Sequence, residues 1–405
     1  MTEQQSTPEL RFSGYTEAWS SYKLKEISER VTRKNKNLES QRPLTISGQL
    51  GLIDQVEYFN KSVSSKDLTG YTLIKKGEFA YNKSYSSGYP LGAIKKLDRY
   101  DLGVLSSLYI CFSFNKNINK DFMKNYFESS KWYKEVASIA VEGARNHGLL
   151  NIPVNDFFNI DVKVTIQSEQ EKIGEFFSKL DRQIELEEKK LEKYKYQIRG
   201  YIQEIFSKNL RFKDDMGNDY PEWSLRKIED ISKVTKGFTP NTKDDENWNI
   251  EERNWLSIAG MTQKYLFNGN KGITQKGALK HSKVEKNTLI MSFKLTLGKL
   301  AIVKEPIYTN EAICHFKWKS NHIDTEYMYY YLNSINIKTF GAQAVKGITL
   351  NNDSINSITV KLPNIDEQKK ISNFLTKFEE MIEKQSSKVD LLKQRKQGLL
   401  QKMFV

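Results

Sequence analysis

The sequence is poor in the residues that hold small domains together covalently or through metals. Only two cysteines occur in 405 residues, Cys111 and Cys314, and they lie far apart without paired spacing. This argues against a disulfide framework and against a zinc ribbon, and it fits a reducing cytoplasm. The four histidines are scattered, with no two at metal-ligand spacing on one helix. We therefore expect no metal ligands in this chain.

The sequence also lacks any long hydrophobic run. The longest mostly apolar stretch, residues 103–114, is too short to cross a bilayer and favours a buried strand. Residues 1–10 are polar and acidic, unlike a signal peptide. We expect a soluble, cytoplasmic protein with no membrane partner.

Motifs for chemistry on nucleic acids and nucleotides are missing as well. The chain has no Pro-Pro pair, so it lacks the Asn/Asp-Pro-Pro-Tyr/Phe run that a DNA adenine methyltransferase needs beside its flipped base. It has no phosphate-binding loop, because the pair Gly272 and Gly277 is not followed by Lys-Ser. These absences predict a chain without catalytic residues of its own.

One segment admits a catalytic interpretation. Residues 367–369, Glu-Gln-Lys, would suit the Glu-x-Lys pair of a nuclease if a distant Asp completed a metal site. The duplicated positions 169–171 read Glu-Gln-Glu and lack that Lys. Both segments begin a predicted helix, where acidic side chains interact favourably with the positive end of the helix dipole. We favour this helix-start interpretation.

Positive charge is what the chain has in excess. Lys and Arg total 63 against 50 Asp and Glu, which gives a net charge of +13. Such an excess favours a polyanionic partner, because each neutralised phosphate releases a condensed counterion. A basic surface that only aids solubility is the alternative. With 38% hydrophobic and 12% aromatic residues, the chain is long enough to bury two domain cores.

The chain repeats itself at half its length. The segment 169–180 recurs as 367–378, and in the same register 200–203 recurs as 398–401, each 198 positions later. Holding one register over so many residues excludes chance similarity. Leu-Arg-Phe followed by Trp also occurs twice, at 10–19 and at 210–223, and between these anchors the similarity fades. The order is variable domain, similar helix, variable domain, similar helix.

Each repeated segment predicts a long helix with a coiled-coil seam, because its apolar residues alternate at spacings of four and three. Glu187 and Gln385 are equivalent polar positions in the two seams, and Lys396 departs from the pattern opposite Ile198. The seam residues singled out are Ile173, Phe177, Leu180, Ile184, Leu191 and Ile198 in the first helix, and Ile371, Leu375, Phe378, Ile382, Val389 and Leu399 in the second.

These helices predict the architecture. A helix of about 40 residues spans about 60 Å, which is longer than one small core. The two helices therefore most simply pair with each other, antiparallel, although each could instead pack only on its own domain. We predict an α+β chain with two globular domains separated by two long helices that form an antiparallel coiled coil with pseudo-two-fold symmetry. The expected segments are 1–19 (lead), 20–165 (first domain), 166–209 (helix), 210–222 (linker), 223–362 (second domain) and 363–405 (helix).

This organisation resembles the specificity subunits of Type I restriction-modification enzymes, over nearly the whole chain. The duplicated Glu-Gln helix start carries the resemblance together with Leu-Arg-Phe and Trp before each domain, and residues 234–240 look like the opening of a target-recognition domain in that family. The resemblance implies that each variable domain reads one half of a split DNA sequence. It also implies that the helices set the unread spacer and, with their seam residues, dock partner subunits.

The resemblance further implies where the chemistry is. Two modification (methyltransferase) subunits would bring S-adenosylmethionine, and restriction subunits, which hydrolyse ATP, would join with Mg. This chain itself would bind none of these cofactors, and its substrate would be double-stranded DNA. The alternatives are a single-chain DNA-modifying or DNA-cutting enzyme and a coiled-coil adaptor that binds only proteins.

Candidate DNA contacts combine basic residues, which anchor phosphates, with side chains that reach base edges. The loops 141–143 and 345–347 stand at similar distances before the two helices, so we expect them in equivalent places. Each loop could instead be an ordinary polar turn. The candidates are Lys83, Tyr85, Arg145, Asn146 and His147 in the first domain, and Lys236, Thr239, Lys294, Thr296, Lys346 and Thr349 in the second.

Overall fold

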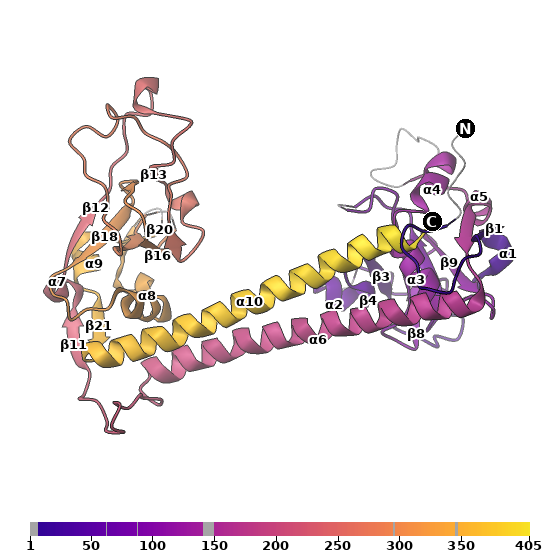
Figure 1. The fold of residues 1–405 in the computed structure, drawn as a ribbon, viewed down its shortest axis with the longest axis horizontal. Helices are drawn as coiled ribbons and strands as arrows, with labels where there is room; N and C mark the ends of the chain where they lie inside the picture. Colours follow the sequence, from indigo (N-terminus) through magenta and orange to yellow (C-terminus); the bar gives the residue numbers. More distant parts are fainter. Residues whose placement is uncertain (1–6, 62, 87, 141–149, 295, 345–346) are drawn as a thin grey trace. The chain divides into compact units, whose positions relative to one another are not determined.

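The computed structural model describes residues 7–61, 63–86, 88–140, 150–294, 296–344 and 347–405 (Figure 1). The chain divides into two compact units, which we call unit 1 (residues 1–189 and 386–405) and unit 2 (residues 190–385). Two long helices, α6 (Gln167–Phe206) and α10 (Ile365–Met403), each supply residues to both units. The described helices include none that is both long enough and apolar enough to cross a membrane.

Unit 1 is built on a four-stranded antiparallel sheet in the order β2-β9-β6-β7. Successive side chains of a strand point to opposite faces, and both faces are covered. Phe79 and Phe112 pack in the core beneath the helices, whereas Ala80 and Cys111 join a second apolar cluster on the other face. The strands are β2 (Ser28–Arg30), β9 (Tyr109–Phe114), β6 (Phe79–Asn82) and β7 (Ala93–Lys96).

Three further strand pairs and five short helices complete the described part of unit 1. The pairs are β1 (Ser20–Lys23) with β10 (Asp161–Val164), β3 (Leu44–Ser47) with β4 (Gly51–Asp54), and β5 (Thr72–Lys75) with β8 (Leu102–Leu105). The helices are α1 (Leu24–Ile27), α2 (Gln55–Phe59), α3 (Lys120–Glu128), α4 (Tyr133–Ile139) and α5 (Val154–Phe158). The single buried strand expected over 103–114 is wrong: β8 and β9 share this stretch, and a turn with the exposed Leu108 separates them.

Unit 2 repeats this sheet, with the order β12-β18-β15-β16 and β14 added in parallel at the end. In unit 1, Ser28 of β2 pairs with Phe114 of β9, and in unit 2, Ser232 of β12 pairs with Trp318 of β18. Each residue of the second pair lies 204 positions after its counterpart in the first. The duplication therefore extends to sheets whose sequences share little. The strands are β12 (Ser232–Lys236), β18 (Ile313–Trp318), β15 (Leu289–Ser292), β16 (Leu300–Val303) and β14 (Tyr265–Leu266).

The other described elements of unit 2 are short strand pairs, one of them parallel, and short helices. Paired strands are β11 (Ser224–Lys227) with β21 (Thr359–Leu362), β13 (Trp255–Leu256) with β17 (Tyr308–Thr309), and β19 (Ala342–Ala344) with β20 (Gly347–Thr349). The α-helices are α7 (Ile228–Ile231), α8 (Thr325–Ser334) and α9 (Asn352–Asn356). Three short 3₁₀ turns lie at Asp245–Asn247, Ile258–Gly260 and Ile337–Phe340.

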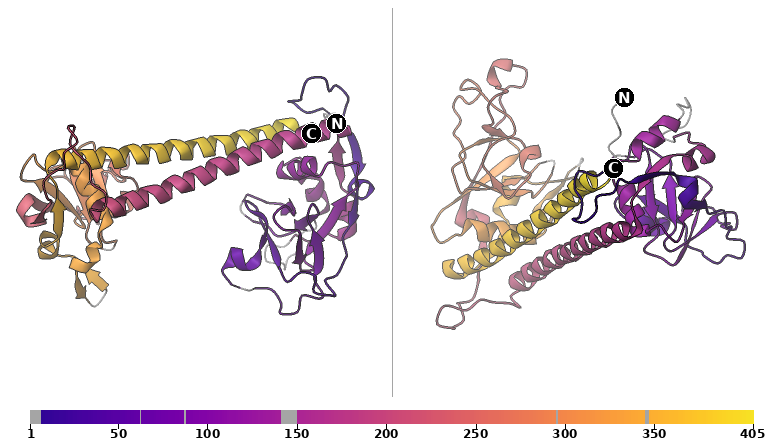
Figure 2. Two further views of the ribbon diagram at one scale, coloured as in Figure 1. Left: turned by 90° about the horizontal axis from the view of Figure 1, so that it is seen from below. Right: turned by 45° about the vertical axis from the view of Figure 1, so that its right-hand side comes forward.

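The two long helices pair in opposite directions within each unit, as expected (Figures 1 and 2). In unit 1, Asp181 of α6 bonds to Lys396 of α10, and the later Glu187 bonds to the earlier Lys388. In unit 2, the Tyr201 ring contacts Phe374, whereas the earlier Tyr194 contacts the later Phe378. This confirms the α+β class and the antiparallel helix pair. The alternative in which each helix packs only on its own domain is wrong, because both cores contain residues of both helices.

Most of the predicted seam is buried. Phe378, Ile382 and Leu399 are only partly buried, and beside Leu399 the fully buried residue is Leu400. The polar seam residue Gln385 is 7% exposed. The buried seam residues are Ile173, Phe177, Leu180, Ile184, Leu191, Ile198, Ile371, Leu375 and Val389. Their part in binding partner subunits stays a prediction.

Candidate nucleic-acid interface

The antiparallel order of the sheet in unit 2 brings several loops to one edge. The ends of β12 and β15 and the starts of β18 and β16 meet there, because neighbouring strands run in opposite directions. We call residues 236–239, 293–294, 296–298 and 310–312 the loop edge of unit 2. Four of the predicted DNA contacts lie on it: Lys236, Thr239, Lys294 and Thr296. The sequence places them up to 60 residues apart, and the fold unites them.

The first of these loops is fixed through its backbone. Gly237 N donates to Ile313 O at 3.1 Å, and Phe238 N donates to Thr309 O at 2.8 Å. A Cβ atom added at Gly237 would lie 2.1 Å from the Thr309 carbonyl oxygen. Only glycine permits this close approach of two backbones. The Trp255 indole N–H adds a hydrogen bond of 2.9 Å to Phe238 O, so the loop is held from two sides.

Thr239 itself is engaged within the loop edge. Its hydroxyl donates to the Glu311 carboxylate and accepts from the Asn310 side-chain amide at 2.8 Å. The exposed Lys236 next to this cluster takes no part in these hydrogen bonds. In this arrangement Thr239 holds the loop in shape, and Lys236 is the group that extends to solvent.

An aromatic stack at this edge could not be predicted from the sequence. The rings of Phe238 and His281 lie parallel, with centroids 3.5 Å apart, and Tyr308 meets Phe238 edge-on at 5.7 Å. The Lys283 ammonium stands 5.7 Å from the Tyr308 ring. His281 is exposed and comes from an irregular stretch 43 residues after Phe238, so no periodicity could have linked the two. The stack adds a rigid, partly basic surface beside Lys236.

The second loop is also closed by its own backbone. Ser292 Oγ donates to Thr296 O, Gly298 N donates to Ser292 O at 2.8 Å, and Lys299 N donates to Ser292 Oγ at 3.1 Å. Gly298 has a φ of +79°, in the region that favours glycine. This turn presents the exposed Lys294 and Thr296 side chains to solvent.

A buried histidine supports the loop edge from inside the sheet. His315 Nε2 bonds to Thr309 Oγ at 2.6 Å, and Nδ1 bonds to Thr235 Oγ at 3.2 Å. Thr309 and Thr235 flank the loop that carries Lys236. Burial, with a smaller contribution from Lys317, lowers the pKa of His315 to about 4. The ring is therefore neutral near pH 7 and acts as a hydrogen-bonding brace.

Unit 1 has the equivalent loop edge, formed by residues 83–86 and 88–92 between β6 and β7 and by the start of β9. Tyr85 is 63% exposed, and Lys83 is half-buried. The backbone N of Leu150 donates to Lys83 O at 2.9 Å, so the chain that follows residues 141–149 returns to this edge. Tyr81 braces the loop through a hydrogen bond of 2.7 Å to Leu91 O.

Several predicted contacts fall outside the described residues: Arg145, Asn146, His147 and Lys346. Thr349 ends β20, whose backbone pairs with Ala342 of β19. The role of these residues in base reading stays a prediction.

The segment that could have suggested a nuclease has a structural explanation. Glu367 is fully buried, and its carboxylate accepts hydrogen bonds from the Arg211 guanidinium at 3.2 and 3.0 Å and from the Trp223 indole at 2.9 Å. No group of three or more His, Cys, Asp or Glu side chains suited to a metal ion is found in the described parts of the chain. Cys111 and Cys314 are both buried, and burial raises the pKa of each thiol to about 12. A reactive cysteine has a lowered pKa instead, so neither residue has the properties of a nucleophile.

Comparison with known proteins agrees with this geometry. Residues 220–391 match the family model described as the Type I restriction modification DNA specificity domain. The Type I restriction enzyme MjaIX specificity subunit of Methanocaldococcus jannaschii is 27% identical over 210 residues, which cover 49% of this chain and 48% of that protein. The MjaVIII specificity subunit of the same organism is 22% identical over 319 residues, 74% of this chain and 73% of that protein. The chain thus aligns with about half the length of the first relative.

Solved structures extend the likeness of fold to nearly the whole chain. The crystal structure of the Type I restriction-modification system S subunit from M. genitalium superposes with a TM-score of 0.57, at 14% identity, over 98% of this chain and 99% of that one. A chain from a study of complex assembly and conformational transition in the type I system gives a TM-score of 0.60, at 14% identity, over 95% and 97%. With the duplicated sheets and the paired helices, these matches show that the chain shares the fold of that S subunit and that residues 220–391 resemble the Type I restriction modification DNA specificity domain.

Proposed function

We propose that this chain selects DNA for a Type I restriction-modification complex by reading two half-sites, one with each unit. The observation that carries the proposal is that the same four-stranded sheet occurs twice, each time with a loop edge that presents exposed side chains. Two similar edges on unlike sequences suit two different half-sites. The helices α6 and α10 connect the units and would set the length of DNA that is not read.

The chemistry of the loop edges suits duplex DNA. Lys236, Lys283 and Lys294 are exposed at the edge of unit 2 and can neutralise phosphates. The net charge of +13 supplies the wider attraction. Base selection then requires polar side chains as well, and our candidates are Thr296 in the second domain and Tyr85 with residues 143–148 in the first.

We further propose that the reactions take place on other chains. Two modification subunits would dock on the helices and bring S-adenosylmethionine, and restriction subunits would bring ATP hydrolysis and Mg. The sequence of this chain has neither an adenine methyltransferase motif nor a phosphate-binding loop, which is consistent with that division. This chain would then be a non-catalytic subunit that binds no cofactor.

The decisive experiment reconstitutes the full chain with a cognate methyltransferase subunit and maps the methylated adenines in random DNA. We expect a bipartite site with one fixed spacer, and duplex binding of micromolar or tighter affinity that weakens steeply with salt. A protein-only adaptor would give no DNA binding in the complex, or binding indifferent to salt. A single-chain enzyme would methylate or cut DNA without any partner. Either result would overturn the proposal.

A further inference from the structure

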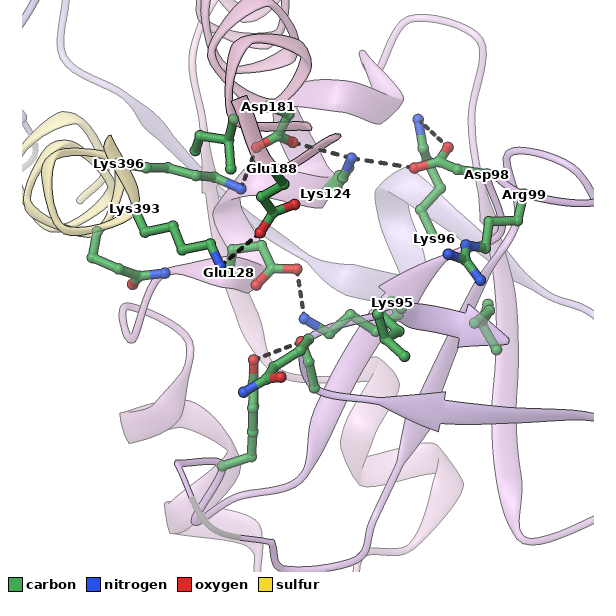
Figure 3. Close-up of a pocket in the computed structure, with 18 of the residues that line it drawn as sticks. Lys95, Lys96, Asp98, Arg99, Lys124, Glu128, Asp181, Glu188, Lys393 and Lys396 are labelled. Carbon is green, nitrogen blue, oxygen red and sulfur yellow. Dashed lines mark hydrogen bonds and ion pairs between the residues drawn. The ribbon is translucent and has the colours of Figure 1, made fainter. Parts of the chain in front are cut away.

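Asp181 and Glu379 occupy the same position in the two repeated helices, 198 residues apart, and each carboxylate is bonded to a lysine of its own recognition domain. In unit 1 the lysine is Lys124 of α3, whose Nζ lies 3.3 Å from Asp181 Oδ2 and 3.3 Å from Asp98 Oδ2 (Figure 3). Lys396 of α10 reaches the other oxygen of Asp181 at 2.6 Å. Asp181 therefore joins the recognition domain to both helices of unit 1.

In unit 2 the lysine comes from a different place. Lys264 stands just before β14, and its Nζ lies 3.0 Å from Glu379 Oε2, 3.0 Å from Glu326 Oε2 and 2.6 Å from the Tyr330 hydroxyl. The ammonium also sits 4.2 Å from the centre of the Tyr330 ring. The Tyr330 hydroxyl donates to Glu379 at 2.5 Å, so all three groups form one closed network on α10.

Two domains of unlike sequence thus reach the same helix position by different routes. In unit 1 the lysine is on α3, whereas the equivalent helix α8 of unit 2 supplies Tyr330 and the lysine comes from the β14 side. A single such pair could be an incidental contact. Its recurrence with a different donor indicates that the carboxylate at this position serves a purpose common to both units.

These pairs differ from the surface pairs of the helices. The Lys264 side chain is 11% exposed, and Lys124 is 29% exposed, whereas Glu175 and Lys179 on α6 are 65% and 75% exposed. Exposed pairs contribute little to structure, because solvent screens them. A partly buried pair holds its geometry more strictly, since breaking it leaves a charge away from water.

Both pairs lead directly to a recognition sheet. The backbone oxygen of Lys264 accepts a hydrogen bond of 2.7 Å from Ile302 N in β16, so one residue binds the sheet with its backbone and α10 with its side chain. In unit 1, α3 is bonded to β7 through Lys95 and Glu128 at 2.6 Å. A rotation of either sheet on its helix would have to break these bonds.

On one side of unit 1 the domain and the helices are not in close contact. A cleft of about 850 Å³ lies between the β3–β4 hairpin, β7 and the two helices, and charged side chains line it (Figure 3). Lys396 with Asp181 and Lys393 with Glu188 bridge the helices along this cleft. At this cleft the domain and the helices are therefore joined by an ion pair, that of Lys124 with Asp181, whereas apolar packing joins them elsewhere in the core of unit 1.

We propose that Asp181 and Glu379 are positioning residues that fix the angle of each recognition sheet on its helix pair and thereby restrict the complex to one spacer length. The inference rests on the proposed function. In this proposal the helices set the spacer length, and two ion pairs, Lys124 with Asp181 and Lys264 with Glu379, keep that length from varying. We call these two ion pairs the latches.

The test has an arm that does not depend on DNA. Spin labels at Asp101→Cys and Lys179→Cys, both exposed positions of unit 1, report the angle between domain and helix in the full-length chain, because both native cysteines are buried. We expect Asp181→Asn to broaden the label-to-label distance distribution. Asp181→Glu, which keeps the charge, should preserve the narrow distribution, and so should the control Glu185→Gln, whose partners Arg182 and Lys189 belong to the same helix.

The second arm uses the reconstituted complex and DNA in which the two half-sites are separated by every spacer length over one helical turn. We expect Asp181→Asn and Glu379→Gln to methylate neighbouring spacer lengths that the wild type leaves unmethylated, with unchanged half-site sequences. Where one of them fails to assemble, Lys124→Gln or Lys264→Gln breaks the same pair from the other side. A wild-type distance distribution and a wild-type spacer preference in the assembled variants would overturn the latch. A wild-type complex without any bipartite preference would instead refute the proposed function.

Discussion

The guanidinium of Arg11 forms two parallel hydrogen bonds with the carboxylate of Glu169, at 2.7 and 2.8 Å, although 158 residues separate them. Glu169 is fully buried. Arg211 and Glu367 repeat the arrangement in unit 2. The two short motifs that recur in the sequence are thus the two halves of one buried ion pair, which ties the segment before each domain to the helix that follows it. A bidentate Arg–carboxylate pair suits this role, because its two parallel hydrogen bonds are strong and also fix the relative orientation of the two groups.

Arg211→Met should destabilise unit 2 severely. The change removes both guanidinium hydrogen bonds to the buried Glu367 carboxylate and keeps the one from the Trp223 indole. Breaking a buried pair from one side costs about 3–5 kcal/mol. Urea unfolding followed by Trp fluorescence measures the loss. Lys213→Met is the matched control, because the pair of Lys213 with Asp219 is 62% and 79% exposed and should contribute less than about 1 kcal/mol. Equal losses in the two variants would contradict the buried-pair interpretation.

The glutamine beside each glutamate explains why the helix-start motif could be recognised but not interpreted from the sequence. Gln170 accepts a hydrogen bond of 2.9 Å from Asn119 N, and Gln368 accepts one of 2.8 Å from Asp324 N. Asn119 and Asp324 are the N-caps of α3 and α8. The sequence shows the repeat because both copies need the same side chains. It does not show the partners, which lie in segments without detectable similarity.

In the sheets, by contrast, the structure repeats where the sequence does not. Phe79 of β6 pairs with Phe112, and at the equivalent place Leu289 of β15 pairs with Phe316. Cores accept such exchanges of apolar residues when volume and pattern are kept, so similarity fades while topology persists. Lys396 was visible only as a break in the apolar seam. Its partner Asp181 explains the break, and only the fold brings the two together.

Unit 2 should lose stability as the pH falls from about 6.5 toward 4. Burial lowers the pKa of His315 from 6.5 to about 4, so in this interval the unfolded chain binds a proton that the folded chain does not. The free energy of unfolding therefore decreases over this window, by up to about 3 kcal/mol, and the His315 contribution is constant above and below it. Denaturant titrations at a series of pH values measure the slope. His315→Gln should flatten the wild-type decrease over this window, and an unchanged slope would contradict the assignment.

Gly237→Ala should disable the reading of one half-site only. The new Cβ would lie 2.1 Å from the Thr309 carbonyl oxygen, so the loop that carries Lys236 must move. Methylation mapping with the reconstituted complex should show relaxed preference at the half-site of unit 2 and unchanged preference at the other. Gly200→Ala is the control: nothing lies within 4 Å of its added Cβ, and in a helix this change should stabilise the chain by about 0.5–1 kcal/mol. Loss of preference at both half-sites would show that the effect is not local.

Lys236→Ala and Lys294→Ala should each reduce the salt dependence of DNA binding without changing the preferred sequence. Both lysines are exposed on the loop edge of unit 2, where an ammonium serves as a phosphate anchor. The slope of log K against log salt concentration is negative, and each lost phosphate contact reduces its magnitude by about 0.9. Lys276→Ala is the matched control, because Lys276 is bonded within the same unit to Asp244 at 3.0 Å and to Glu246 at 2.5 Å. It should leave the slope unchanged. A variant that keeps the slope but alters the preferred bases would show instead that its lysine reads the sequence directly, since phosphate contacts carry no base information.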